Sequence, residues 1–192
     1  MKQIIFFLIA FGLALHAHAE EQVQKQESAQ KLKAFVGFGG GNSLIARDGT
    51  VWIKIESGLQ VNSHTQIGLY ASTIVSDIKN PYKKDLPQYI DYNALGLFGE
   101  FTILKKEVFS LSIPVSAGAG VINIMKQNVE HSKAEDGFFV AEAGLSFNCQ
   151  LTQVLRISLA GGWRQFLDID NNKLNNKDFN TLFGEISFRW TE

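Results

Sequence analysis

Residues 181–190 read TLFGEISFRW, and apolar and polar side chains alternate along this stretch. Leu182 and Ile186 fall on one side, whereas Glu185 and Arg189 fall on the other. An alternation with a period of two is typical of a β-strand whose two faces meet different surroundings. We therefore predict a strand here with one apolar face and one polar face.

Seven earlier stretches alternate in the same way, and the connections between them are in turn long and short. We expect short connections at Val61–His64, Leu104–Glu107 and Asn148–Gln153, and long ones at Gly40–Thr50, Asp77–Ile90, Asn123–Asp136 and Leu167–Asp178. Eight strands joined in this order are typical of an up-and-down barrel with one elaborate rim and one plain rim. The predicted fold class is all-β, an antiparallel up-and-down eight-stranded transmembrane β-barrel over residues 32–192.

All charged residues of the predicted strands fall on the polar face. They are Lys33, Lys54, Glu56, Glu100, Glu142, Arg156, Arg164, Glu185 and Arg189. An Arg or Lys that faces lipid near the bilayer midplane costs about 2–4 kcal/mol, so this segregation favours an apolar face toward lipid. The polar face is also rich in Gly, Ser and Ala, which suits the narrow interior of an eight-stranded barrel. A soluble lipocalin-like barrel, with its apolar face turned inward, remains the alternative.

Charges inside a narrow lumen need partners of opposite sign. We predict a lumen ionic network, formed by Lys54, Glu56, Glu100, Glu142, Arg156, Arg164, Glu185 and Arg189. Arg156 and Glu185, on neighbouring strands, are expected to pair. The network is expected to plug the barrel, so that the lumen is no open pore.

The first nineteen residues have the features of a cleaved signal peptide. Lys2 supplies a positive charge, Ile4–Leu15 is apolar, and Ala17–Ala19 forms an A-x-A cleavage site. The apolar run is shorter than the roughly 18 residues that a membrane-spanning helix needs, so we interpret it as a leader and not as an anchor. Residues 20–31, EEQVQKQESAQK, are polar and are expected to form a periplasmic arm.

The leader, the alternating connections and the aromatic closing strand GEISFRW at residues 184–190 resemble a known class. Over residues 32–190 the chain is similar to small eight-stranded outer-membrane barrels of the OmpX, OmpW and opacity-protein kind. The resemblance implies a location in the bacterial outer membrane, with outer-membrane lipid, lipopolysaccharide and the barrel-insertion machinery as partners. Such barrels usually finish on an aromatic residue that helps this machinery to recognise them, whereas Thr191 and Glu192 follow Trp190 here. Pro114 also departs from the pattern, because a closed barrel has no free edge for a missing N–H, and we expect a bulge there.

Few residues suggest chemistry. His131-Ser132 is the nearest match to the His and Ser pair of lipid A deacylases, but adjacent residues point to opposite faces of a strand. Residues 168–178, DIDNNKLNNKD, lack the Gly and the bidentate Glu of a calcium loop.

Residues 37–42, GFGGGN, open no helix and lack the Lys of a phosphate loop, so we expect their glycines to permit curvature. Asp48-Gly49 predicts a tight hairpin tip inside the first long connection, and Cys149 has no second cysteine as a partner.

The chain has 18 Lys and Arg residues and 19 Asp and Glu residues, a formal net charge of −1. This balance argues against a nucleic-acid partner, which requires a basic face. The favoured function is a structural or interaction protein of the outer membrane that displays four extracellular loops, with no catalytic residue, cofactor or metal. A transport barrel for small or hydrophobic compounds, a lipid-modifying enzyme and a soluble lipocalin-like binder are the alternatives. The sequence names no extracellular ligand.

Overall fold

The structure is a computed structural model that describes residues 32–45, 48–76, 78–79, 88–126, 134–171 and 174–192. The predicted leader and the predicted polar arm, residues 1–31, lie outside the described residues. Within the described ranges, no helix has the length and apolar character needed to cross a membrane.

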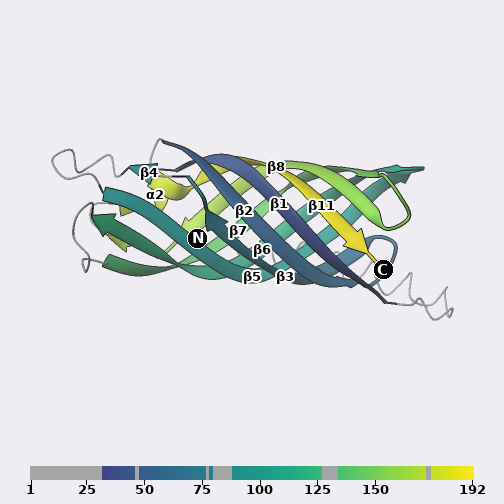
Figure 1. Cartoon of the computed structure of the whole chain (residues 1–192), viewed down its shortest axis with the longest axis horizontal. Helices are drawn as coiled ribbons and strands as arrows, with labels where there is room; N and C mark the ends of the chain where they lie inside the picture. The colour runs from purple at the N-terminus through teal and green to yellow at the C-terminus, as the bar shows by residue number, and fades with distance from the viewer. Residues whose placement is uncertain (1–31, 46–47, 77, 80–87, 127–133, 172–173) are drawn as a thin grey trace, which may run out of the picture. The chain divides into compact units, whose positions relative to one another are not determined.

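Eight long strands make up most of the described chain. They are β1 (Lys33–Ile45), β2 (Asp48–Gln60), β3 (Thr65–Ile74), β5 (Gln88–Lys106), β6 (Phe109–Lys126), β7 (Ala134–Gln150), β8 (Leu155–Leu167) and β11 (Thr181–Thr191). Neighbouring strands are antiparallel in the order β3-β2-β1-β11-β8-β7-β6-β5, and pairing of β3 with β5 closes the barrel (Figure 1). The predicted all-β, eight-stranded antiparallel barrel is confirmed.

Short turns join the strands at one end of the barrel, which we call the short-turn end. They comprise residues 61–64, 107–108 and 151–154. The first matches the prediction, and the other two are shorter than predicted because β5 and β7 run on into the expected turns. Glu107 has a φ of 51°, in the left-handed region that a tight turn requires and that few residues other than Gly adopt.

The opposite end of the barrel, which we call the long-connection end, carries four small elements. They are β4 (Ile78–Lys79), β9 (Asp170–Asn171), β10 (Leu174–Asn175) and α2 (Asn176–Phe179). Figure 1 shows β4 and α2 at the end away from the C-terminus. These elements lie between β3 and β5 and between β8 and β11, within two of the predicted long connections.

The first predicted long connection, Gly40–Thr50, is wrong. Strand β1 continues to Ile45 and β2 begins at Asp48, and the two strands pair without interruption up to Ile45 opposite Asp48. The expected hairpin is therefore present, but Asp48 and Gly49 belong to β2 and do not form its tip. Three connections at this end are long, and the glycine-rich segment continues a strand.

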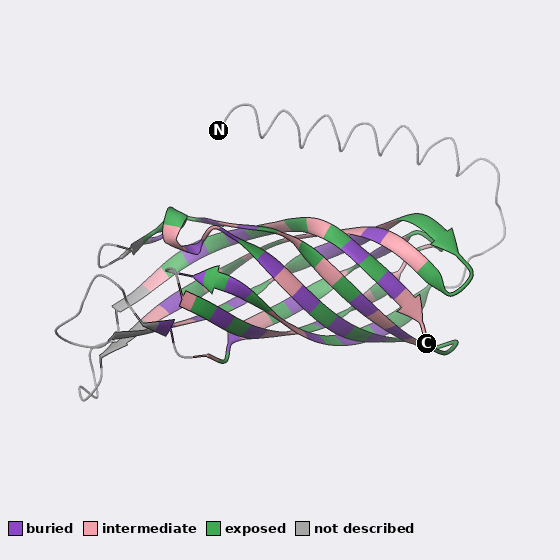
Figure 2. Cartoon of the chain, turned by 90° about the horizontal axis from the view of Figure 1, so that it is seen from above, coloured by how far each residue is buried: buried purple, intermediate pink, exposed green. Residues whose placement is uncertain are grey.

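The two faces of the barrel differ as the alternation predicts, and Figure 2 shows exposed and buried residues alternating along the strands. Large apolar side chains cover the outside, among them Val36, Phe38, Leu97, Leu145, Leu159 and Ile186, each more than half exposed. The inward face of the same strands holds buried charged, polar and aromatic side chains. The barrel is therefore apolar outside and mixed inside, the reverse of a water-soluble protein.

The sheet passes Pro114 without the expected bulge. Residues of β6 and β7 pair as far as Ser112 with Ser146 and resume at Val115 with Ala143, so two positions go unpaired while the register is kept. The irregularity that β6 does have lies on its other side, where the register with β5 shifts between Thr102 and Leu104. The β6–β7 ladder thus accommodates the missing N–H of Pro114 by leaving two positions unpaired, and no extra residue is inserted there.

Candidate functional site in the barrel interior

The eight charged residues singled out in the sequence all lie inside the barrel. Strand β2 carries Lys54 and Glu56, β5 carries Glu100, β7 carries Glu142, β8 carries Arg156 and Arg164, and β11 carries Glu185 and Arg189. Their side chains are between 1 and 11 % exposed. Four cations therefore face four carboxylates in a largely buried interior, where each needs a partner of opposite sign.

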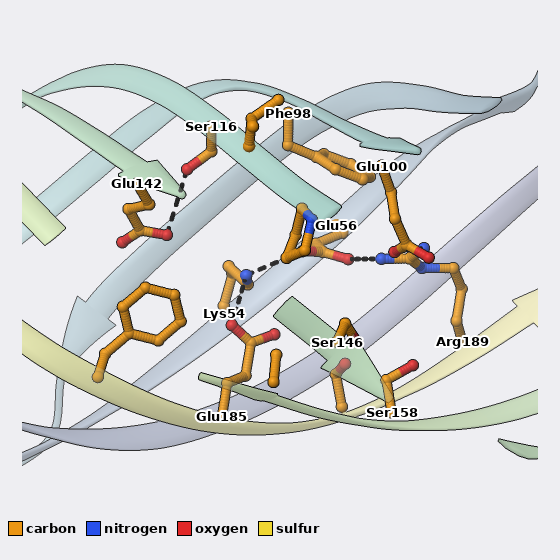
Figure 3. Close-up of a pocket in the computed structure, with 15 residues that line it drawn as sticks. Lys54, Glu56, Phe98, Glu100, Ser116, Glu142, Ser146, Ser158, Glu185 and Arg189 are labelled. Carbon is orange, nitrogen blue, oxygen red and sulfur yellow. Dashed lines mark hydrogen bonds and ion pairs between the residues drawn. The ribbon is translucent and has the colours of Figure 1, made fainter. Parts of the chain in front are cut away.

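Six of these residues form one continuous chain of ion pairs. Arg156 Nη2 lies 3.0 Å from Glu100 Oε1, and the other oxygen of Glu100 accepts from Arg189 Nη1 at 2.7 Å. Arg189 Nη2 then donates to Glu56 Oε2 at 2.6 Å. Lys54 Nζ completes the chain, 3.0 Å from Glu56 and 2.7 Å from Glu185 (Figure 3). Each inner member of this ionic chain is shared between two partners.

Arg164 and Glu142 form a separate pair. Arg164 Nε donates to Glu142 Oε1 at 2.5 Å, and its Nη1 donates to the hydroxyl of Tyr92 at 2.8 Å. Glu142 also accepts from the hydroxyl of Ser116 at 3.2 Å (Figure 3). The guanidinium lies 4.5 Å from the ring centroid of Trp52, within the range of a cation–π contact.

The partners of Arg156 and Glu185 differ from the pairing that the sequence suggested. Arg156 pairs with Glu100, across the lumen. On the neighbouring strands, Arg156 lies opposite Arg189, whereas Glu185 lies opposite Ala160, four positions further along. Arg164 and Glu142 are the pair that lies directly opposite on neighbouring strands. Two of the six ion pairs that the structure describes cross the lumen to Glu100, and two more join β2 and β11 across β1. Among these six, pairing between directly adjacent strands accounts only for Arg164 and Glu142.

Glycines of β1 make room for the ionic chain. Strand β1 lies between β2 and β11, and its Gly37 and Gly39 face inward. A Cβ on Gly37 would lie 3.4 Å from a carboxylate oxygen of Glu56 and 3.6 Å from Arg189 Nε, and one on Gly39 would lie 3.2 Å from a carboxylate oxygen of Glu185. Charged side chains of β2 and β11 thus meet over β1 because β1 has no side chains there.

Gln66 belongs to this site and was not identified from the sequence. Its side-chain carbonyl accepts hydrogen bonds from Arg156 Nη2 at 3.1 Å and from Arg189 Nη1. Gln66 holds the two guanidinium groups side by side beside the single carboxylate of Glu100. Apolar and polar residues alternate only imperfectly along β3. Gln66 is an even number of positions from the inward-facing Tyr70, however, and this spacing could have predicted that Gln66 also faces inward.

A second feature that the sequence analysis missed is a cluster of apolar side chains inside the long-connection end, which we call the apolar plug. It consists of Ile45, Ile74, Ile78, Ile90, Tyr92, Ala94, Ile122, Phe138, Val140, Phe166, Ile169 and Phe179. The ring centroid of Phe166 lies 5.2 Å from Phe138 and 5.5 Å from Phe179. The run Phe138-Phe139-Val140, in which the alternation fails, was the signal for it.

Little space remains between the charged side chains. The cavity beside the ionic chain measures about 30 Å³, room for about two water molecules. Its lining includes Lys54, Glu56, Ser116, Glu142 and Arg189 (Figure 3). A larger cavity of about 290 Å³ opens at the short-turn end and reaches Arg156.

The other candidate residues are not brought together with this interior. His131 and Ser132 lie outside the described residues. Over the segment 168–178, Asp178 caps α2 by accepting from the N–H of Asn175. Among the described residues, no group of three His, Cys, Asp or Glu side chains is placed to hold a metal ion. Cys149 is a half-buried free thiol near the short-turn end.

No protein-family model matches this chain, and no curated protein matches it. Solved structures do match. Neisserial surface protein A has a TM-score of 0.55 at 10 % identity, with 85 % of this chain and 99 % of that chain covered. The attachment invasion locus protein Ail of Yersinia pestis has a TM-score of 0.55 at 11 % identity, with coverages of 85 % and 100 %. A major outer membrane protein from Thermus thermophilus has a TM-score of 0.61 at 8 % identity, again with coverages of 85 % and 100 %.

The chain has the fold of the small outer-membrane β-barrels. At these identities the likeness concerns the fold alone. An outer-membrane β-barrel presents apolar residues on its outside and polar residues in its lumen, and both surfaces are found here. The resemblance inferred from residues 32–190 is confirmed at the level of the fold.

Proposed function

We propose that this chain is a structural or interaction protein of the bacterial outer membrane, a sealed barrel that displays its three long connections on the outer side. The observation that carries the proposal is the filled interior. The apolar plug occupies the long-connection end, and the ionic chain with the Arg164–Glu142 pair occupies the middle. A rigid scaffold with no through-passage is suited to presenting loops, where binding residues concentrate.

The apolar outside of the barrel supports the membrane location. Leu97, Leu145 and Leu159 are more than half exposed on the outside of the barrel, where water would disfavour them and lipid would not. In the proposed topology, residues 1–19 are a cleaved leader and residues 20–31 a periplasmic arm. Lipid, lipopolysaccharide and the insertion machinery are the proposed partners of the barrel.

We assign the barrel neither transport nor catalysis. Transport along the lumen needs a continuous path, whereas about 30 Å³ remains beside the ionic chain. The described histidine, His64, is exposed at the short-turn end, and its Nδ1 lies 3.1 Å from the carbonyl oxygen of Thr102. This contact is that of a turn residue and not of a catalytic base held beside a nucleophile.

Leu159→Arg tests the membrane location. Leu159 is 60 % exposed on the outside of β8, and an Arg there is expected to lower the free energy of unfolding in lipid vesicles by about 2–4 kcal/mol. Leu151→Arg is the matched control, since Leu151 is similarly exposed but lies in a short turn beyond the strands. We expect the control to assemble normally in the envelope, with mobility on electrophoresis that shifts on heating. Normal assembly of Leu159→Arg, or recovery of the protein in the soluble periplasmic fraction, would favour the lipocalin-like alternative.

Recordings from planar bilayers test the sealed lumen. The purified protein is expected to insert and to show no steady conductance. A stable, large conductance would overturn the sealed barrel and favour the transport alternative, while leaving the membrane location intact.

A further inference from the structure

The cavity at the short-turn end has the features of a binding site and not of a plain barrel mouth. Its volume is about 290 Å³, enough for a small polar solute. Amide and hydroxyl side chains line its wall, among them Gln60, Asn62, Thr65 and Gln150. Such a wall offers many hydrogen-bond donors and acceptors to a ligand.

The charges that line this cavity are mainly positive. Lys33 and Lys105 lie at the mouth, and Arg156 contributes the deepest cation, against the single carboxylate of Glu107. Neither Lys33 nor Lys105 forms an ion pair with a residue that the structure describes. An anion in the cavity would therefore meet cations that are free to bind it.

Arg156 supplies the second, independent observation. It is 9 % exposed and lines the cavity, and its Nη2 donates to Gln66 and Glu100. Its Nε is buried and has no hydrogen-bond partner in the part of the chain that the structure describes. A buried donor without an acceptor is rare in folded proteins and calls for an explanation. The Nε itself has almost no accessible surface, so an oxyanion would meet Arg156 on the side of the guanidinium that lines the cavity, and the unpaired Nε marks a guanidinium whose hydrogen bonds are incomplete before an anion binds.

We propose that the short-turn cavity binds a small solute that carries a carboxylate or phosphate group. The oxyanion lies against Arg156, whose planar guanidinium matches the geometry of such groups, and Lys33 and Lys105 hold it at the mouth. The polar wall binds the remainder of the solute. In the proposed topology this end faces the periplasm, so the ligand is a periplasmic solute, but the binding itself does not depend on that topology.

Calorimetry of the purified barrel in detergent tests the proposal, with inorganic phosphate and succinate as the two probes and glucose as a neutral control. Saturable binding of phosphate or succinate at low ionic strength is expected, and the stronger of the two identifies the preferred oxyanion. The double variant K33Q/K105Q is expected to weaken binding by about tenfold for each charged hydrogen bond that is lost. The matched control is K106Q, which removes an equally exposed charge that does not line the cavity.

A resonance of the unaltered protein provides a readout that needs no substitution in the ionic chain. The Nε–H signal of Arg156 in the nitrogen–proton spectrum is expected to shift on titration, with the same dissociation constant as the calorimetry. Absence of saturable heat for both oxyanions, or an Arg156 signal that stays in place at saturation, would overturn the proposal. So would a K106Q variant that binds as weakly as K33Q/K105Q, because the effect would then reflect surface charge in general.

Discussion

At the scale of single residues, the interior is organised by how charges share partners. Glu100 accepts from Arg156 and Arg189, and Lys54 donates to Glu56 and Glu185. Every ion pair of the ionic chain therefore shares at least one side chain with another ion pair. Taking a charge out of water carries a large desolvation cost that only close, hydrogen-bonded partners offset. The barrel accordingly carries equal numbers of inward cations and carboxylates in its middle.

The Arg164–Glu142 pair is suited to a double-mutant cycle because it is separate from the ionic chain. Glu142→Gln leaves Arg164 charged, 1 % exposed and without its carboxylate, so we expect a loss of about 3–5 kcal/mol in the free energy of unfolding. Adding Arg164→Met should recover part of this loss, since the stranded charge is removed. Unfolding by urea in lipid vesicles measures both values. Additive losses in the double variant would show that the two side chains do not depend on each other.

At the scale of elements, the long-connection end is closed by segments that reach inward. Helix α2 is only four residues long, and it is held by a capping box between Asn175 and Asp178. The side-chain oxygen of Asn180, just after the helix, accepts from the N–H of Phe166 at 2.6 Å. These bonds place Phe179 in the apolar plug, where it is fully buried. A connection that looks like an ordinary loop in the sequence thus contributes part of the seal.

Phe166→Ala tests whether the apolar plug seals the lumen. Phe166 is fully buried among the rings of Tyr92, Phe138 and Phe179, so its truncation should cost about 3–5 kcal/mol through lost burial and a new cavity. Phe139→Ala is the matched control, since Phe139 points outward and is 56 % exposed. In planar bilayers, transient conductance is expected from Phe166→Ala and not from the control. A destabilised but non-conducting Phe166→Ala would assign the seal to the ionic chain.

At the scale of the whole barrel, closure joins parts of the chain that are distant in sequence. Strand β1 pairs with β11 from Phe35 opposite Thr191 to Ser43 opposite Phe183, and β3 pairs with β5. The residues that follow Trp190 bond to both neighbours of β11: Glu192 N donates to the carbonyl of Ala34 in β1, within this seam, and Thr191 N donates to that of Val154 in the turn before β8. The seam can form only once both ends of the barrel domain are available.

Proteolysis of intact cells tests the orientation of the barrel. Trypsin is expected to cut within the connections that join strands at the long-connection end, at Lys83, Lys84 or Lys133, because the proposed topology exposes that end. Lys105 and Lys106, beside the short turn between β5 and β6, should be protected until the outer membrane is opened. Mass spectrometry of the released peptides identifies the sites. Cleavage at Lys105 or Lys106 in intact cells would reverse the orientation.

The sequence by itself determined the number of strands, their two faces and the inward position of the charges. This information is local, because the surroundings of a strand select its side chains with a period of two. Leu159 and Ile186 on the outside, and Arg164 and Glu185 on the inside, follow from parity alone. The turn at residues 61–64 was likewise readable, since polar residues separate two alternating stretches.

Only the tertiary structure decided which charges meet and what seals the barrel. Arg156 reaches Glu100 across the lumen. That contact depends on the stagger of all the strands between them, and this stagger cannot be derived from the sequence of any one strand. The glycines at 37–42 were expected only to permit curvature, and the predicted connection began at Gly40. Their role became visible only with the charged side chains that lie over Gly37 and Gly39 in the closed barrel. The apolar plug escaped prediction for the same reason: Phe138, Phe166 and Phe179 come from three separate elements, and only closure of the barrel brings their rings into contact.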